Sequence, residues 1–111
     1  MYNLIREIEK GQQQMKARTY RLYIGCNDKD TKHQELSNKE IERRIDKYTL
    51  QRFNDYTITQ GRGCWKGGQE HTYIIEIITA NKRAIKALGQ ELEIAINQEE
   101  VLITETKTKT L

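Results

Sequence analysis

The stretch Thr72-Tyr73-Ile74-Ile75-Glu76-Ile77-Ile78 is the most apolar run in the chain. After Thr72 it is apolar at every position except Glu76, so both of its faces can be buried, as in a strand at the centre of a sheet. Such a strand is stable only with a neighbour on each side. The run therefore predicts a sheet, and the flanking segments determine which sheet it is.

A strand, a helix and a second strand precede this run. Residues 19–25 alternate between an apolar face and a face that carries Arg21 and Tyr23. Ser37, followed three residues later by Glu40, is typical of a capping box, and the apolar spacing behind it predicts a helix. Residues 55–60 alternate again and predict the second strand.

A helix and a last strand follow the run. Asn81 can cap a helix whose apolar residues recur at helical spacing as far as Ala95, and residues 100–106 predict a strand. The order is β-α-β-β-α-β. It predicts an α+β fold of the ferredoxin-like kind, a four-stranded antiparallel sheet with two helices on one face.

The first residues predict one more element. Apolar residues recur at roughly helical spacing from Leu4 to Met15, which predicts a short N-terminal helix. So short a helix must dock on its own domain or on a second subunit, and we favour the second. We therefore expect an N-terminal helix and linker over residues 1–18, a ferredoxin-like domain over residues 19–106 and a tail over residues 107–111.

Composition argues against several classes of protein. Nineteen basic and 16 acidic residues leave a net charge of +3, too balanced for the basic stripe of a nucleic-acid-binding protein. No apolar run approaches the roughly 18 residues that span a bilayer, and the first residues lack the apolar core of a signal peptide. We expect a cytoplasmic protein in which Cys26 and Cys64 are reduced thiols.

Residues 61–68, Gly-Arg-Gly-Cys-Trp-Lys-Gly-Gly, hold four of the seven glycines and the only tryptophan. We interpret them as a loop between strands, where backbone N–H groups, Arg62 and Lys66 can meet a small anionic ligand. The alternative is a long hairpin whose Trp65 packs on the sheet edge or on another subunit. The segment matches neither the dinucleotide fingerprint nor the P-loop, and we expect no cofactor.

The topology predicts where a site would lie. Residues 26–37, 61–70 and 97–100 connect elements at the same end of the sheet, and loops on a rigid scaffold often carry binding residues. Glu76 is a further candidate, because it is a charge within the central strand. The side chains expected to contact a ligand are Arg62, Trp65, Lys66, Glu70, Glu76 and Glu99.

Two alternatives involve chemistry at this end. Glu76 either pairs with Arg21 across the strands or keeps a raised pKa and acts as an acid or base. Cys26 and His33 are seven residues apart, as are Cys64 and His71, so the four could form a zinc set, although the spacing is unlike that of common zinc sites. We assign no metal ligands.

The order of elements resembles the ferredoxin-like superfamily over residues 19–106. Within it, Gly-x-Gly-x-Trp-x-Gly-Gly-x-Glu (residues 61–70) and Asn-Gln-Glu-x-Val-Leu-Ile (residues 97–103) resemble small uncharacterised bacterial and phage proteins, a resemblance that implies no chemistry. At the level of fold, the chain is also similar to small trimeric regulators of the CutA and PII groups, which bind ligands between subunits.

These observations favour a small homo-oligomeric binding or regulatory protein with a ligand site at the glycine-rich end of the sheet. The sheet face without helices would need to be covered, which favours an oligomer of this chain. The alternative is a small enzyme that uses Glu76 or the region of Cys64 and His71. RNA binding on the open face ranks last, because Tyr73 has the wrong parity to join Tyr23 there.

Overall fold

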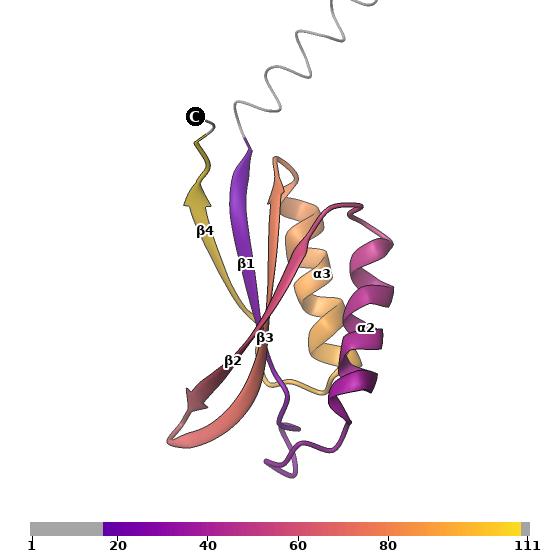
Figure 1. Ribbon diagram of the computed structural model, residues 1–111, viewed down its shortest axis with the longest axis vertical. Helices are drawn as coiled ribbons and strands as arrows, with labels where there is room; N and C mark the ends of the chain where they lie inside the picture. Colours follow the sequence, from indigo (N-terminus) through magenta and orange to yellow (C-terminus); the bar gives the residue numbers. More distant parts are fainter. Residues whose placement is uncertain (1–16, 110–111) are drawn as a thin grey trace, which may run out of the picture.

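The computed structural model describes residues 17–109. Their elements are β1 (Arg18–Gly25), α2 (Asn38–Leu50), β2 (Thr57–Trp65), β3 (Gly68–Thr79), α3 (Lys82–Ala95) and β4 (Leu102–Lys107). Both helices lie on one face of a single sheet (Figure 1). The predicted α+β architecture is thus confirmed, while the helix expected before residue 18 lies outside the described residues.

The strand order is β2-β3-β1-β4, and every neighbouring pair is antiparallel. β1 pairs with β3 from Arg18 opposite Thr79 to Gly25 opposite Thr72, and with β4 from Arg18 opposite Lys107 to Tyr23 opposite Leu102. The apolar run lies in β3, which has a partner on both sides, as the sequence predicted. β1 is the second central strand.

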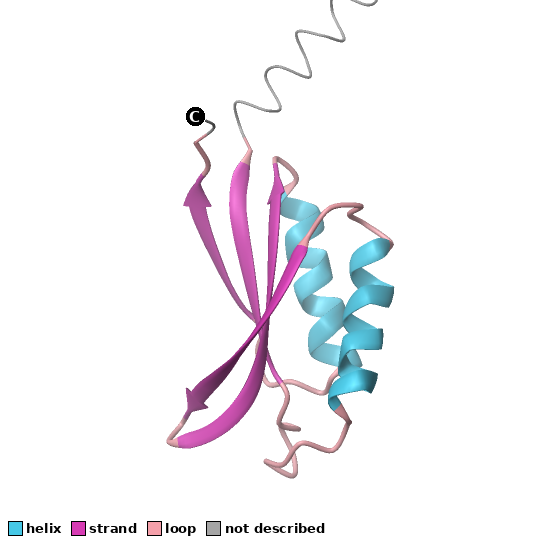
Figure 2. Cartoon of the chain, in the orientation of Figure 1, coloured by secondary structure: helices cyan, strands magenta, loops and turns pink. Residues whose placement is uncertain are grey.

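The core lies between the sheet and the two helices, and Figure 2 shows both helices on the same side of the strands. Alternation along β3 sends Tyr73, Ile75 and Ile77 into this core, with 0–1% of each residue exposed. Burying one such side chain contributes about 1.5–3 kcal/mol. The opposite sheet face has no helix over it within residues 17–109, and we call it the open face.

Both helices begin at the residues that the sequence indicated. The hydroxyl of Ser37 accepts the Glu40 N–H at 3.1 Å, and the Asn81 side chain accepts the Ala84 N–H at 3.0 Å. The Glu40 carboxylate turns to Arg43 and Arg44 on its own helix, and their hydrogen bonds lower its pKa to about 2. Neither helix within the described range is long and apolar enough to cross a membrane.

The glycine-rich segment differs from the loop we expected. β2 continues to Trp65 and β3 already begins at Gly68, so the two strands form one long hairpin. Its tight turn has positive φ at Lys66 (51°) and at Gly67 (81°), which is the pattern of a two-residue turn matched to strand twist. Gly61 and Gly63 sit in extended backbone, where their small size rather than an unusual conformation matters.

Candidate functional site

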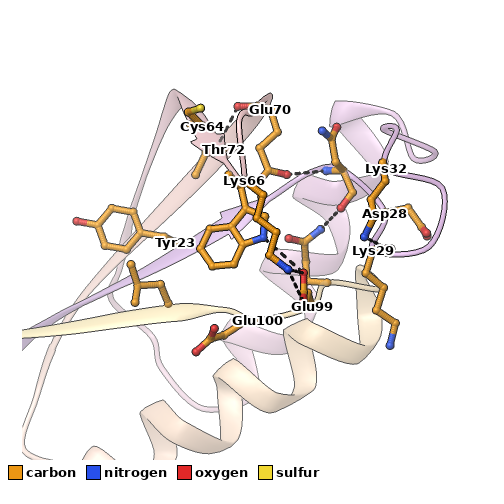
Figure 3. A pocket seen from close by; sticks show the side chains of 17 residues that line it. Tyr23, Asp28, Lys29, Lys32, Cys64, Lys66, Glu70, Thr72, Glu99 and Glu100 are labelled. Carbon is orange, nitrogen blue, oxygen red and sulfur yellow. Dashed lines mark hydrogen bonds and ion pairs between the residues drawn. The ribbon is translucent and has the colours of Figure 1, made fainter.

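A pocket of about 450 Å³ opens where the sequence placed three loops together. It lies at the end of the sheet, between the β2–β3 hairpin, the β1–α2 loop and the α3–β4 loop (Figure 3). Most of the strand residues that line it lie on the open face, because they alternate with core residues such as Leu22 and Ile24 of β1 and Tyr73 of β3. Its lining includes the side chains of Tyr23, Trp65, Lys66, Glu70, Glu99 and Leu102.

Glu99 ties the hairpin turn to the α3–β4 loop. The Lys66 ammonium lies 3.0 and 3.3 Å from its two carboxylate oxygens, and the Trp65 indole N–H donates to it at 3.5 Å (Figure 3). The hydrogen bond from Lys66, followed by that from Trp65, lowers the pKa of the Glu99 carboxyl. All three side chains are well exposed, so this contact contributes little to stability.

Glu70, unlike Glu99, contacts the backbone of the neighbouring strand end and not a lysine. Its carboxylate accepts the backbone N–H of Asn27 at 3.1 Å, at the point where the chain leaves β1. Among residues 17–109, no lysine, arginine or histidine forms an ion pair with it. Glu70 therefore brings to the pocket a carboxylate that forms no ion pair within residues 17–109.

The β1–α2 loop is anchored to the α3–β4 loop by a hydrogen-bonded network. Asn97, in a left-handed conformation with φ of 53°, donates its side-chain amide to Asp28 at 2.7 Å and to Asp30 at 3.0 Å. Its carbonyl accepts the Lys29 N–H at 3.0 Å. The Asn97 hydrogen bond is the main cause of a lowered pKa at Asp28. This network gives one wall of the pocket a defined shape.

Two of the predicted ligand residues lie elsewhere. Arg62 is paired with His71 along the hairpin and is exposed outside the pocket lining. Glu76 lies further along β3 and pairs with Arg21 at 2.9 Å, which is the cross-strand alternative weighed above. The structure brings together the other four, Trp65, Lys66, Glu70 and Glu99.

The cysteines and histidines do not converge. Cys26 is buried, and burial, with Glu70 and Glu42 nearby, raises the pKa of its thiol to about 12, whereas Cys64 is exposed. His71 packs edge-on against Tyr73, with 4.9 Å between ring centres. Among the residues that the structure describes, no group of three or more histidine, cysteine, aspartate or glutamate side chains is arranged to hold a metal ion.

The pocket is also lined by residues that sequence reasoning did not include in the site. Tyr23 and Leu102 supply apolar surface, and Gly25 and Asn27 shape the floor beneath Glu70. The parity of β1 already placed Tyr23 on the open face. A glycine at the end of an otherwise apolar strand was a signal of close approach by another group.

No family model and no curated protein matches this chain. Solved structures do. A phage SAM lyase in complex with S-methyl-5′-thioadenosine matches with a TM-score of 0.66 and 19% identity, over 82% of this chain and 81% of that chain. The same kind of phage enzyme in its apo state matches with a TM-score of 0.54 and 20% identity, over 80% and 78%.

A DUF3240 family protein from Shewanella baltica OS155 also matches, with a TM-score of 0.56 and 14% identity, over 86% of this chain and 97% of that chain. Identities this low establish a shared fold and leave function to the site itself. The fold that the sequence predicted thus occurs in solved proteins of similar length.

Proposed function

We propose that this protein binds a sulfonium nucleoside, S-adenosylmethionine or a close analogue, in the pocket at the end of the sheet. The observation that carries the proposal is the Glu70 carboxylate, which lies at the pocket with no cationic partner from residues 17–109. A carboxylate in such a place favours a ligand that brings the positive charge itself.

The other properties of the pocket suit a nucleoside. Its volume of about 450 Å³ is within the range of small-molecule sites. Tyr23 and Trp65 line it and offer flat aromatic faces against which an adenine ring can stack. Carboxylate and amide groups nearby, such as Glu99 and Gln98, can accept or donate hydrogen bonds to ribose hydroxyls.

A cationic ligand fits better than the anionic one that the sequence led us to expect. Lys66 is engaged by Glu99, and Arg62 lies outside the pocket lining. Lys29 and Lys32 do line the wall, but Asp28, Glu70, Glu99 and Glu100 line the pocket as well. The lining thus holds four carboxylates against three lysines, and among these side chains only Lys66 and Glu99 form an ion pair.

A second candidate function is cleavage of that ligand. The support is the shared fold with a phage SAM lyase whose complex holds S-methyl-5′-thioadenosine. In such a cleavage a carbon–sulfur bond breaks, the electron pair stays on sulfur, and the sulfonium becomes a neutral thioether. If the departing carbon chain loses a proton to form an alkene, Glu70 is the carboxylate in the pocket that can accept that proton.

We also propose that a second copy of this chain covers the open face. Ile78, Leu102 and Trp65 are large apolar residues there with 58%, 53% and 48% of their surface exposed. The pocket opens onto the same face, so a second copy would close it from the side that the sheet leaves free. Exposed apolar surface of this kind is typical of association sites.

Binding is tested by isothermal titration and by the fluorescence of Trp65, the only tryptophan. S-Adenosylmethionine should bind more tightly than S-adenosylhomocysteine, which has the same nucleoside but a neutral sulfur. Glu70→Gln should abolish this difference, while Glu35→Gln, in the exposed part of the β1–α2 loop, should retain it. Equal affinity of the wild type for both compounds, or no binding of either, would refute the proposal.

The same samples test cleavage and assembly. Mass spectrometry of S-adenosylmethionine after incubation should show S-methyl-5′-thioadenosine if the protein is a lyase, and unchanged substrate if it only binds. Native mass spectrometry should give a multiple of the 13.1 kDa chain mass. A monomer at micromolar concentration would overturn the proposed association and leave the ligand proposal to be judged by titration.

A further inference from the structure

The backbone does not explain why residue 25 is a glycine. Gly25 is the last residue of β1, paired with Thr72 of β3, in regular extended structure. Of the glycines in residues 17–109, only Gly67 has a positive φ. A side chain at position 25 would therefore meet no conformational obstacle, and glycine in a strand often marks a place where another group approaches closely.

The space beside Gly25 is occupied by Glu70. A Cβ atom placed on Gly25 would lie 2.5 Å from the carboxyl carbon of Glu70, far inside normal contact distance. The same carboxylate accepts the Asn27 N–H at 3.1 Å. The missing side chain thus lets the carboxylate lie across the end of β1, and the N–H two residues later holds it there.

We propose that Gly25 and the Asn27 N–H are the positioning groups for Glu70 in ligand recognition, an inference that rests on the proposed function of this pocket. Gly25 provides the room, and the Asn27 N–H fixes the orientation of the carboxylate. Neither needs to touch the ligand. Together they aim the charge of Glu70 at the pocket instead of leaving it free to turn toward water.

The experiment compares Gly25→Ala with Gly61→Ala. In Gly25→Ala the atoms displaced are the far end of a flexible side chain, so Glu70 turns away and the strands stay paired. A Cβ on Gly61 meets nothing within 4 Å, which makes Gly61→Ala a matched control on the same sheet. Affinity for S-adenosylmethionine should fall about tenfold or more in the first and by about twofold or less in the second.

NMR of the protein without ligand tests the positioning of Glu70 separately from ligand binding. In the wild type, the NMR shift of the Asn27 amide should follow the ionisation of Glu70, because the two are hydrogen-bonded. That titration should vanish in Gly25→Ala and in Glu70→Gln and persist in Gly61→Ala. Glu70→Asp, whose shorter side chain fails to reach Asn27, should also lose it.

The two proposals fail in different ways. If the Asn27 amide titrates in Gly25→Ala as it does in the wild type, the positioning role is overturned whatever the protein binds. If the amide behaves as expected but no sulfonium compound binds the wild type, the proposed ligand is wrong and the role in ligand recognition falls with it. Tenfold weaker binding in Gly25→Ala together with loss of the amide titration supports both.

Discussion

The two halves of the β2–β3 hairpin are held in different ways. Its base, residues 57–60 and 73–79, lies where the helices cover the sheet, and Ile75 and Ile77 are buried beneath them. Its tip, residues 61–72, extends past the covered region and is mostly exposed (Figure 1). The tip depends on strand pairing, on a tight turn and on the contact of Lys66 with Glu99.

This difference shows what stabilises each half. At the base, the free energy comes from burial, so the identity of side chains matters through volume and apolarity. At the tip little is buried, and its glycines and charges affect stability weakly. Substitutions in the base should therefore change folding, whereas substitutions in the tip should change the pocket.

The largest effect is expected from Ile75→Ala in the base. Ile75 is completely buried, and its truncation leaves a cavity, so the free energy of unfolding should fall by about 2–5 kcal/mol. Ile94→Ala is the control, because it is the same substitution at a residue of α3 with 83% of its surface exposed. Its effect should stay within about 0.5 kcal/mol in urea denaturation. Equal losses in both variants would contradict the assignment of Ile75 to the core.

A smaller effect is expected from Tyr56→Phe, just before β2. The Tyr56 hydroxyl donates to Asp46 of α2 at 2.7 Å, so its removal should cost about 1–2 kcal/mol. Burial and then the Asp46 hydrogen bond raise the pKa of Tyr56 to about 12. The stabilisation by the Tyr56 hydroxyl is therefore present below the unfolded pKa of about 10 and is lost as the pH rises through the folded pKa of about 12. If denaturation curves of wild type and variant stay equally far apart at pH 8 and at pH 12, this assignment is incorrect.

The smallest effect is expected from loss of the contact between Lys66 and Glu99 in the tip. Because the pKa of Glu99 is lowered in the folded protein, its contact with Lys66 persists above the unfolded pKa of about 4.3 and is lost as the pH falls through the lower folded value. Trp65 emission should change over that acid range, whereas the loss of this exposed contact should contribute little to any change in the free energy of unfolding. Glu99→Gln should remove the change, and a response that survives this substitution would have another source.

Alternation and capping were enough to predict the central strand β3 and the two helices that pack on it. The apolar run of β3, the serine cap at Ser37 and the asparagine cap at Asn81 are local signals, and each appears in the structure where the sequence indicated it. Topology then brought Trp65, Lys66, Glu70 and Glu99 to one end, as expected.

The tip was less predictable for a physical reason. Four glycines in eight residues are compatible with a loop or with strands, and only pairing with residues 68–72 decides between them. Gly25 indicated a close approach, but the sequence did not show by which group, because Glu70 is 45 residues away in the chain and adjacent only after folding. Sequence periodicity carries no information on contacts of that kind.

The pairing of β1 with β4 has a consequence for mechanical strength. The first residue of β1 lies opposite the last residue of β4, since Arg18 pairs with Lys107. Force applied at these two residues would therefore load the ladder one hydrogen bond at a time and peel β4 away at low tension. Force applied between residue 18 and the hairpin turn would instead act along the strands and load many bonds together. The same domain should be weak in the first direction and resistant in the second.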